Sequence, residues 1–387
     1  MRFSGLLLLA GLSSSALAVD ASLEPWEIDP SCKGFEQDIK NALTESIDLA
    51  GAARDSLNFV LARMPDRKSD PNGAIKWARI SEAINAVFGF TPDLKGQGST
   101  TKQFIEEMRD MYSLTAKTLP SSQNFPPNGF SPVLSKRPNA KPLIVCGDDV
   151  FKWYDADEEP EPGVGKVKDQ KIFKDAEASG VTLAGAFYYK GRWDPRKTKA
   201  QSIGLCMGNR NALISSINDN LIICPTMLDA AGRARTTPRQ YKASAALGDD
   251  IMSNWVSNPT QIYHELMHWF GGVDSKLKHR IQDHIAVDGK GLLRFKNAQG
   301  QEERYSRLPS GQELKQKGQR KQGAYGIKHI IYLAAPRDGN PYCGPKVATT
   351  NADSLAMFSF MMYLDQFDWS KGVARDMTRI KQKLHIP

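Results

Sequence analysis

Some common features are scarce or missing in this sequence. It contains no Asn-x-Ser/Thr acceptor for N-linked glycans, because Asn258 is followed by proline. It shows no internal repeat, and beyond its first eighteen residues no long uncharged apolar run, so we expect no membrane span there. Histidine is also rare, with six in 387 residues. Two of the six nevertheless lie four residues apart around a glutamate, a spacing that chance rarely produces.

The first eighteen residues have the pattern of a secretory signal peptide. Arg2 precedes an apolar run from Leu6 to Ala10, and Ala16 and Ala18 supply a small-residue cleavage pattern. We expect cleavage after Ala18 and a secreted, extracellular mature protein. All five cysteines lie in the mature part, where an oxidising environment favours pairing. One of the five must stay unpaired or bond elsewhere.

The two closely spaced histidines lie on a segment that has the signals of a short helix. Asn258 is a suitable N-cap and Pro259 a suitable first helical residue, while the glycines at 271 and 272 are good terminators. Between these ends, apolar residues repeat at helical spacing, with Ile262 and Leu266 among them. The helix can therefore anchor in a core and present its histidines rigidly.

The sequence HELMH on this segment is an HExxH motif. Residues four apart share a helix face, so His264 and His268 can bind one zinc ion while Glu265 takes a proton from water. A catalytic zinc site normally has three protein ligands, so a third must come from downstream. Asp274 fits an HExxHxxGxxD spacing, and Asp283 is the other candidate. The alternative is a chance motif whose histidines are merely packed or solvated.

Apolar periodicity predicts a helical first half and strands in the second half. Helical three- and four-residue steps occur in residues 32–61, 74–88 and 101–118. From Pro142 the pattern changes to short strands, which we expect to form one sheet, at residues 143–145, 181–189, 213–217 and 221–224. Two further helices are predicted to start near Tyr325 and Asn351. These elements together predict an α+β protein.

Positive charge gathers in one segment of the second half. The chain has a formal net charge of +8, and residues 275–322 hold twelve Lys/Arg against five Asp/Glu. A nucleic-acid-binding arm is one interpretation, but the segment has no recognisable binding motif. We expect a solvated basic insertion and no nucleic-acid partner. The insertion would belong to a single domain at 19–387, with a helical half at 19–141 and a sheet and active-site half at 142–387.

Four blocks of the sequence resemble one family of secreted metallopeptidases. They are the strand-like Ile222-Ile223-Cys224-Pro225, the HExxH motif, Tyr325-Gly326, and Asn351-Ala352-Asp353-Ser354. In this order they resemble the aspzincins, the deuterolysin and lysine-specific metalloendopeptidase family of fungi. The resemblance implies a zincin-like α+β fold, in which N-terminal helices pack on a small mixed sheet beside an active-site helix and C-terminal helices.

The resemblance also implies roles for individual residues. His264 and His268 would bind one zinc ion, and Glu265 would act as general base. Tyr325 would stabilise the oxyanion of the tetrahedral intermediate, although it could instead be an ordinary aromatic residue at a helix start.

The chain departs from the family pattern at the third metal ligand. The family aspartate lies three residues before the tyrosine, and this position is Gln322 here. The ligand would then be Asp283 or Asp274. We favour Asp283, because its neighbours Ile281 and Ile285 predict a buried, strand-like anchor.

A second departure concerns the substrate pocket. Asp353 matches a substrate-binding aspartate of the lysine-specific branch, but the glutamate expected three residues on is replaced by Ala356. We therefore expect no strict lysine preference. The alternative is that Asp353 caps the final helix.

The resemblance further suggests a disulfide between Cys206 and Cys224. Cys32 could pair with Cys146 and tie the helical half to the sheet, which would leave Cys343 unpaired.

The overall expectation is a secreted, monomeric zinc endopeptidase that acts on proteins or peptides. The alternative is a non-catalytic secreted binding protein or effector that retains a degenerate zincin scaffold.

Overall fold

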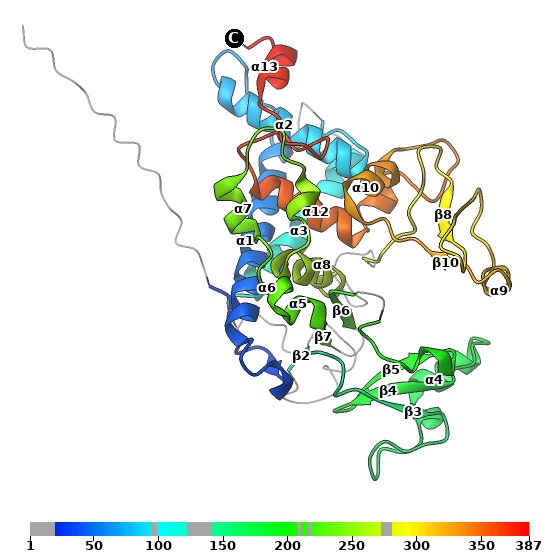
Figure 1. Cartoon of the computed structure of the whole chain (residues 1–387). Coiled ribbons are helices and arrows are strands. Elements are labelled where there is room, and N and C mark those ends of the chain that lie inside the picture. Colours follow the sequence, from blue (N-terminus) through cyan, green and yellow to red (C-terminus); the bar gives the residue numbers. More distant parts are fainter. Residues whose placement is uncertain are drawn as a thin grey trace, which may run out of the picture.

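The chain folds as a mixture of helices and small sheets, which confirms the predicted α+β class (Figure 1). The computed structural model describes residues 20–93, 99–121, 141–207, 210–215, 219–271 and 281–386. The predicted signal peptide at 1–18 and the candidate ligand Asp274 lie outside the described residues. No helix in the described ranges is both long and apolar enough to cross a membrane.

The helices are α1 (Glu36–Leu61), α2 (Pro71–Phe88), α3 (Ser99–Thr118), α4 (Lys171–Ala178), α5 (Pro225–Leu228), α6 (Ala230–Arg233), α7 (Pro238–Ser244), α8 (Asn258–Phe270), α9 (Gly311–Gln316), α10 (Gly326–Ala334), α11 (Pro345–Ala348), α12 (Ala352–Tyr363) and α13 (Thr378–Leu384). The strands are β1 (Glu27–Ile28), β2 (Leu143–Cys146), β3 (Lys152–Asp155), β4 (Gly185–Tyr189), β5 (Arg192–Arg196), β6 (Ala212–Ser215), β7 (Asn220–Ile223), β8 (Leu293–Lys296), β9 (Glu302–Tyr305) and β10 (Arg320–Lys321).

The long helices form the body of the molecule, and their packing positions α8. Helix α1 packs against α3, α8 and α12, so helices from both ends of the chain share one core. Helix α12 is buried on almost every side, as expected for a helix whose sequence is apolar all round. The three predicted N-terminal helices and the helices expected near Tyr325 and Asn351 are all confirmed.

The main sheet lies beside α8 and has the strand order β1-β2-β7-β6. Strands β1, β2 and β7 run parallel, while β6 pairs antiparallel with β7 and forms an edge. The sheet is therefore small and mixed, as predicted. Its edge strand β6 packs against α8 and runs past the histidine-bearing face.

One predicted strand belongs to a different sheet, so the expectation of a single sheet was wrong. Strand β4 pairs with β3 and β5 in a separate three-stranded sheet. The reason is local. Lys190 and Gly191 both have positive φ and form a two-residue turn, which pairs Tyr189 with Arg192 and fixes β4 against β5.

The described part of the basic segment, residues 281–322, contains a third small sheet with the order β10-β8-β9. Its own apolar cluster contains Val287, Leu293 and Phe295 beside the free, buried Cys343. This sheet and the β3-β4-β5 sheet both project from the same side of the helical body in Figure 1. The charged residues within 281–322 are thus carried by a folded unit.

Two disulfides cross-link the described chain. Cys32 bonds to Cys146 and Cys206 bonds to Cys224, while Cys343 is free. Both pairings confirm the expectation, and the first ties the helical half to the main sheet. Two disulfides are compatible with a secreted protein.

The first disulfide is expected to contribute more stability than the second. It spans 114 residues against 18, and a longer loop costs the unfolded chain more entropy when it is closed. Replacing Cys32 and Cys146 with serine should lower the free energy of unfolding by about 5 kcal/mol, against about 3 kcal/mol for the other pair. Urea unfolding of both double variants measures this, and a larger loss in the Cys206/Cys224 variant would contradict it.

Candidate metal centre

Helix α8 presents both histidines from one face. The predicted N-cap was one residue late, because Ser257 rather than Asn258 caps the helix. The Thr260 hydroxyl lies within hydrogen-bonding distance of the Ser257 backbone N–H and hydroxyl, both at 3.1 Å, and closes the first turn. The helix ends at Phe270, with Gly271 as C-cap, as expected from the two glycines.

The end of α8 is also where the chain returns towards the histidines. Ile281 donates its backbone N–H to the Gly271 carbonyl and packs over that glycine. A Cβ at Gly271 would lie 2.1 Å from Ile281 Cδ1, so only glycine permits this approach. Gln282 then forms a β-bridge with Asn351, just before α12. These contacts fix the backbone immediately before the next residue, Asp283.

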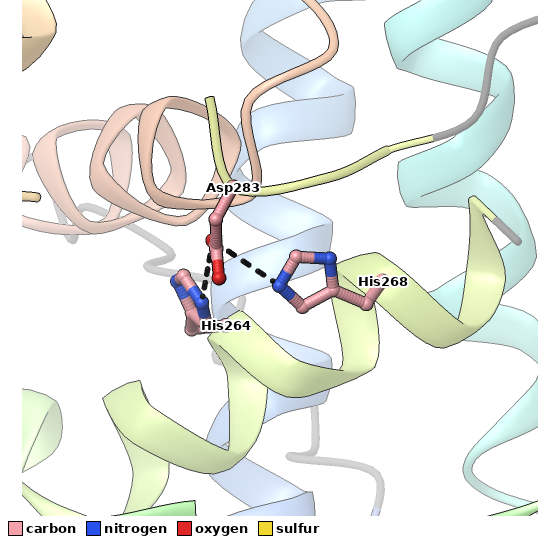
Figure 2. Close-up of side chains that lie close together, drawn as sticks. All are labelled: His264, His268 and Asp283. Carbon is pink, nitrogen blue, oxygen red and sulfur yellow. Dashed lines mark ion pairs between the residues drawn. The ribbon is translucent and has the colours of Figure 1, made fainter. Parts of the chain in front are cut away.

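Asp283 meets both histidines at one point (Figure 2). Its Oδ1 lies 3.3 Å from His264 Nε2 and 3.3 Å from His268 Nε2. One ligand atom from each of the three residues lies within 4.8 Å of the others, which makes them a possible metal-binding triad. Of the two predicted third ligands, Asp283 is therefore brought to the histidines.

The outer nitrogen of each histidine is held by an acceptor. His264 Nδ1 lies 3.2 Å from Asp353 Oδ1, and His268 Nδ1 lies 3.2 Å from the Ile281 carbonyl oxygen. An acceptor at Nδ1 favours the tautomer with its proton there, which leaves the Nε2 lone pair free for a cation. The orientation of both rings is thus the one that a metal site requires.

Asp353 lies behind His264 in the first turn of α12. It is only 3% exposed, and its second oxygen accepts a hydrogen bond of 2.6 Å from the Gly326 backbone N–H. The prediction that Asp353 binds substrate stays a prediction. The side chain does line the same cavity, but its two oxygens contact His264 and Gly326.

Removing the charge of Asp353 should weaken metal binding. We expect Asp353→Asn to lower metal affinity by about 10- to 100-fold, because such outer partners fix the ring and raise its basicity. Titration of the metal into the apo protein measures the effect. Asp368→Asn, another buried aspartate that lies outside the cavity lining, is the control. Equal affinity in the two variants would contradict a positioning role.

Glu265 and Tyr325 face the triad from two elements. Glu265 lies between the two histidines in the sequence, is half-buried and lines the cavity. Burial raises the pKa of its carboxyl group. Tyr325 caps α10, and its hydroxyl donates a hydrogen bond of 2.8 Å to Asp283 Oδ2. Burial of the hydroxyl and the charge of Asp283 raise the pKa of Tyr325, so it remains a proton donor at neutral pH.

The electrostatics of the triad favour a bound positive charge. Burial opposes ionisation of Asp283, but hydrogen bonds from His264 and His268 outweigh it and hold the pKa of Asp283 well below its usual range. Burial likewise opposes protonation of His264, yet its contacts with Asp283 and Asp353 raise its pKa well above the ordinary value. A cation that replaces the proton of His264 would satisfy the same carboxylates.

His284, the next residue after Asp283, should make the protein less stable in acid. Its Nε2 lies 2.8 Å from Thr350 Oγ1, and burial lowers the pKa of the ring to about 4. The unfolded chain binds a proton near pH 6.5, whereas the folded chain does so only near pH 4. The stabilising contribution is therefore complete above pH 6.5 and is lost as the pH falls towards 4.

This loss should amount to about 2–3 kcal/mol of unfolding free energy between pH 7.5 and pH 4. Urea unfolding at both pH values, with a chelator present throughout, compares the wild type with His284→Gln. The variant should show a smaller decrease by that amount. Identical decreases in the two proteins would contradict the assignment.

The triad opens into a cavity of about 830 Å³. Its walls come from the edge strand β6, the segment from Met252 to Val256, helix α8, and the start of α10. Sequence patterns marked Ile281 only as an apolar neighbour of Asp283; they did not predict that its carbonyl oxygen holds His268. They did not single out the Met252–Val256 segment. No local pattern marks either role, because each depends on tertiary contacts.

Comparison of the chain with protein-family models, curated proteins and solved structures finds no match. The candidate site therefore rests on its own geometry and on the residues that compose it.

Proposed function

We propose that this chain is a secreted, zinc-dependent endopeptidase with a zincin-like, aspzincin-type site. The observation that carries the proposal is the convergence of His264 Nε2, His268 Nε2 and Asp283 Oδ1 in the wall of a large cavity that Glu265 also lines. Three protein ligands that leave a further position open are typical of catalytic zinc rather than structural zinc.

The donor set supports zinc in particular. Two imidazole nitrogens and one carboxylate oxygen suit zinc, whereas calcium and magnesium prefer sites made entirely of oxygen atoms. A zinc ion held there would polarise the scissile carbonyl group and lower the pKa of a water molecule.

The protein's own residues would supply the remaining chemistry. Glu265 would accept a proton from the attacking water and return it to the leaving amine. Burial raises the pKa of Glu265, which makes its carboxylate a better proton acceptor. Tyr325, whose hydroxyl already points to Asp283, would donate a hydrogen bond to the oxyanion. Asp353 and the Ile281 carbonyl would keep the two rings oriented.

Metal analysis and a casein-type assay on the purified protein test the proposal together. We expect one zinc ion per chain, and peptidase activity that a chelator removes and added zinc restores. Protein that binds no zinc would favour the alternative, a non-catalytic binding protein or effector on the same scaffold. That alternative is based on one observation: Gln322 stands at the position where the family has its metal-binding aspartate.

A further inference from the structure

One wall of the metal cavity is apolar. Met252, Trp255 and Val256 line it, and they lie on and just after a short 3-10 helix at Ile251–Asn254. Trp255 is buried against the core, Met252 is half-buried, and Val256 is 40% exposed. Trp255 thus anchors the wall in the core, while Val256 leaves apolar surface exposed.

A series of contacts links this wall to the histidines of the triad. Met252 Sδ accepts a hydrogen bond of 3.4 Å from the Ile327 backbone N–H, and a Cβ at Gly326 would lie 3.0 Å from Met252 Cε. Gly326 in turn donates to Asp353, the partner of His264. His264 and Met252 are therefore linked through only two residues, Asp353 and Gly326.

Among the described residues that line the cavity, no carboxylate is left to pair with a positively charged substrate side chain. Of its lining carboxylates, Asp283 and Asp353 contact the histidines and Glu265 is the proposed base. Ala356, where the lysine-specific pattern has a glutamate, is fully buried in the core. The positively charged side chain of Arg210 also lines the cavity. It donates a hydrogen bond to the Leu205 carbonyl and has no carboxylate partner among the described residues.

We infer that the wall of Met252, Trp255 and Val256 forms a specificity subsite for a large apolar side chain next to the scissile bond. The inference rests on the proposed endopeptidase function and assigns its substrate class. An apolar side chain would cover the exposed part of Val256, whereas a lysine would lose its hydration without gaining a partner. Peptides with leucine, methionine or phenylalanine at that position should be cut at least about tenfold faster than those with lysine.

A peptide library of mixed sequence, with cleavage sites read by mass spectrometry, tests the preference. The wild type should enrich apolar residues at one position beside the cut and deplete lysine there. Val256→Asp places a carboxylate in the wall and should shift the ratio of lysine to leucine cleavage upward by about tenfold or more. Leu308→Asp is the matched control, because Leu308 is 44% exposed and lies outside the cavity lining, and it should leave the ratio unchanged.

A binding measurement separates this inference from the proposed activity. Leucine hydroxamate and lysine hydroxamate are titrated into the zinc-loaded wild type, Val256→Asp and Leu308→Asp, after thermal melting has shown that all three fold. Tighter binding of the leucine probe, lost only in Val256→Asp, supports the subsite even if no peptide is cut. Cleavage without apolar bias, or equal binding of both probes by the wild type, would overturn the subsite and leave the endopeptidase proposal standing.

Discussion

Glu265→Gln is expected to lower peptidase activity by about 10²–10⁴-fold while zinc remains bound. Glutamine keeps the size of the side chain but cannot accept the proton of the attacking water. Because Glu265 is not one of the three residues of the possible metal-binding triad, the geometry of that triad should not depend on the charge of Glu265. Initial rates on a casein-type substrate, measured together with bound zinc, test both parts of this statement.

Glu313→Gln is the matched control for this experiment. It makes the same chemical change on α9, outside the cavity lining, and should leave the rate unchanged. Activity that survives in Glu265→Gln would refute the mechanism. Loss of zinc together with activity would instead show that Glu265 has a structural role at the site.

Asp283→Ala should remove the metal. The change deletes the only carboxylate oxygen that lies 3.3 Å from both histidine Nε2 atoms in the described structure. The loss of affinity should exceed the 10- to 100-fold effect expected for an outer partner such as Asp353. Zinc content after dialysis, and competition with a chromophoric chelator, measure the loss.

Two further variants make this test decisive. Asp338→Ala removes an exposed aspartate outside the cavity lining and should bind zinc as the wild type does. Asp274→Ala removes the other predicted ligand and should also keep its zinc. If Asp274→Ala lost the metal while Asp283→Ala retained it, the assignment of the third ligand would be wrong.

Local sequence was enough to predict the elements that carry the site. The ends of α8 follow from a cap, a proline and a glycine, all of which act within one turn. The boundary error of one residue arose because Ser257 and Thr260 form a capping pair that outcompetes Asn258. The error did not affect the face on which the histidines lie.

Long-range pairing was harder to predict. The strand pattern at β4 was correct, but its sheet was not, because a tight turn at Lys190 and Gly191 commits it to β5. Apolar alternation shows that a segment is a strand and does not show which edge it joins.

The sequence by itself determined that two histidines and a glutamate share one helix, because helical periodicity places residues four apart on the same face. It also supplied two candidate aspartates, Asp283 and Asp274, and favoured Asp283 because of its apolar neighbours. Tertiary structure brought Asp283 to the histidines, set Asp353 and the Ile281 carbonyl behind them, and built the apolar wall at Val256. The physical reason is that a third ligand and its supports come from chain segments whose distance in space depends on the packing of the whole fold.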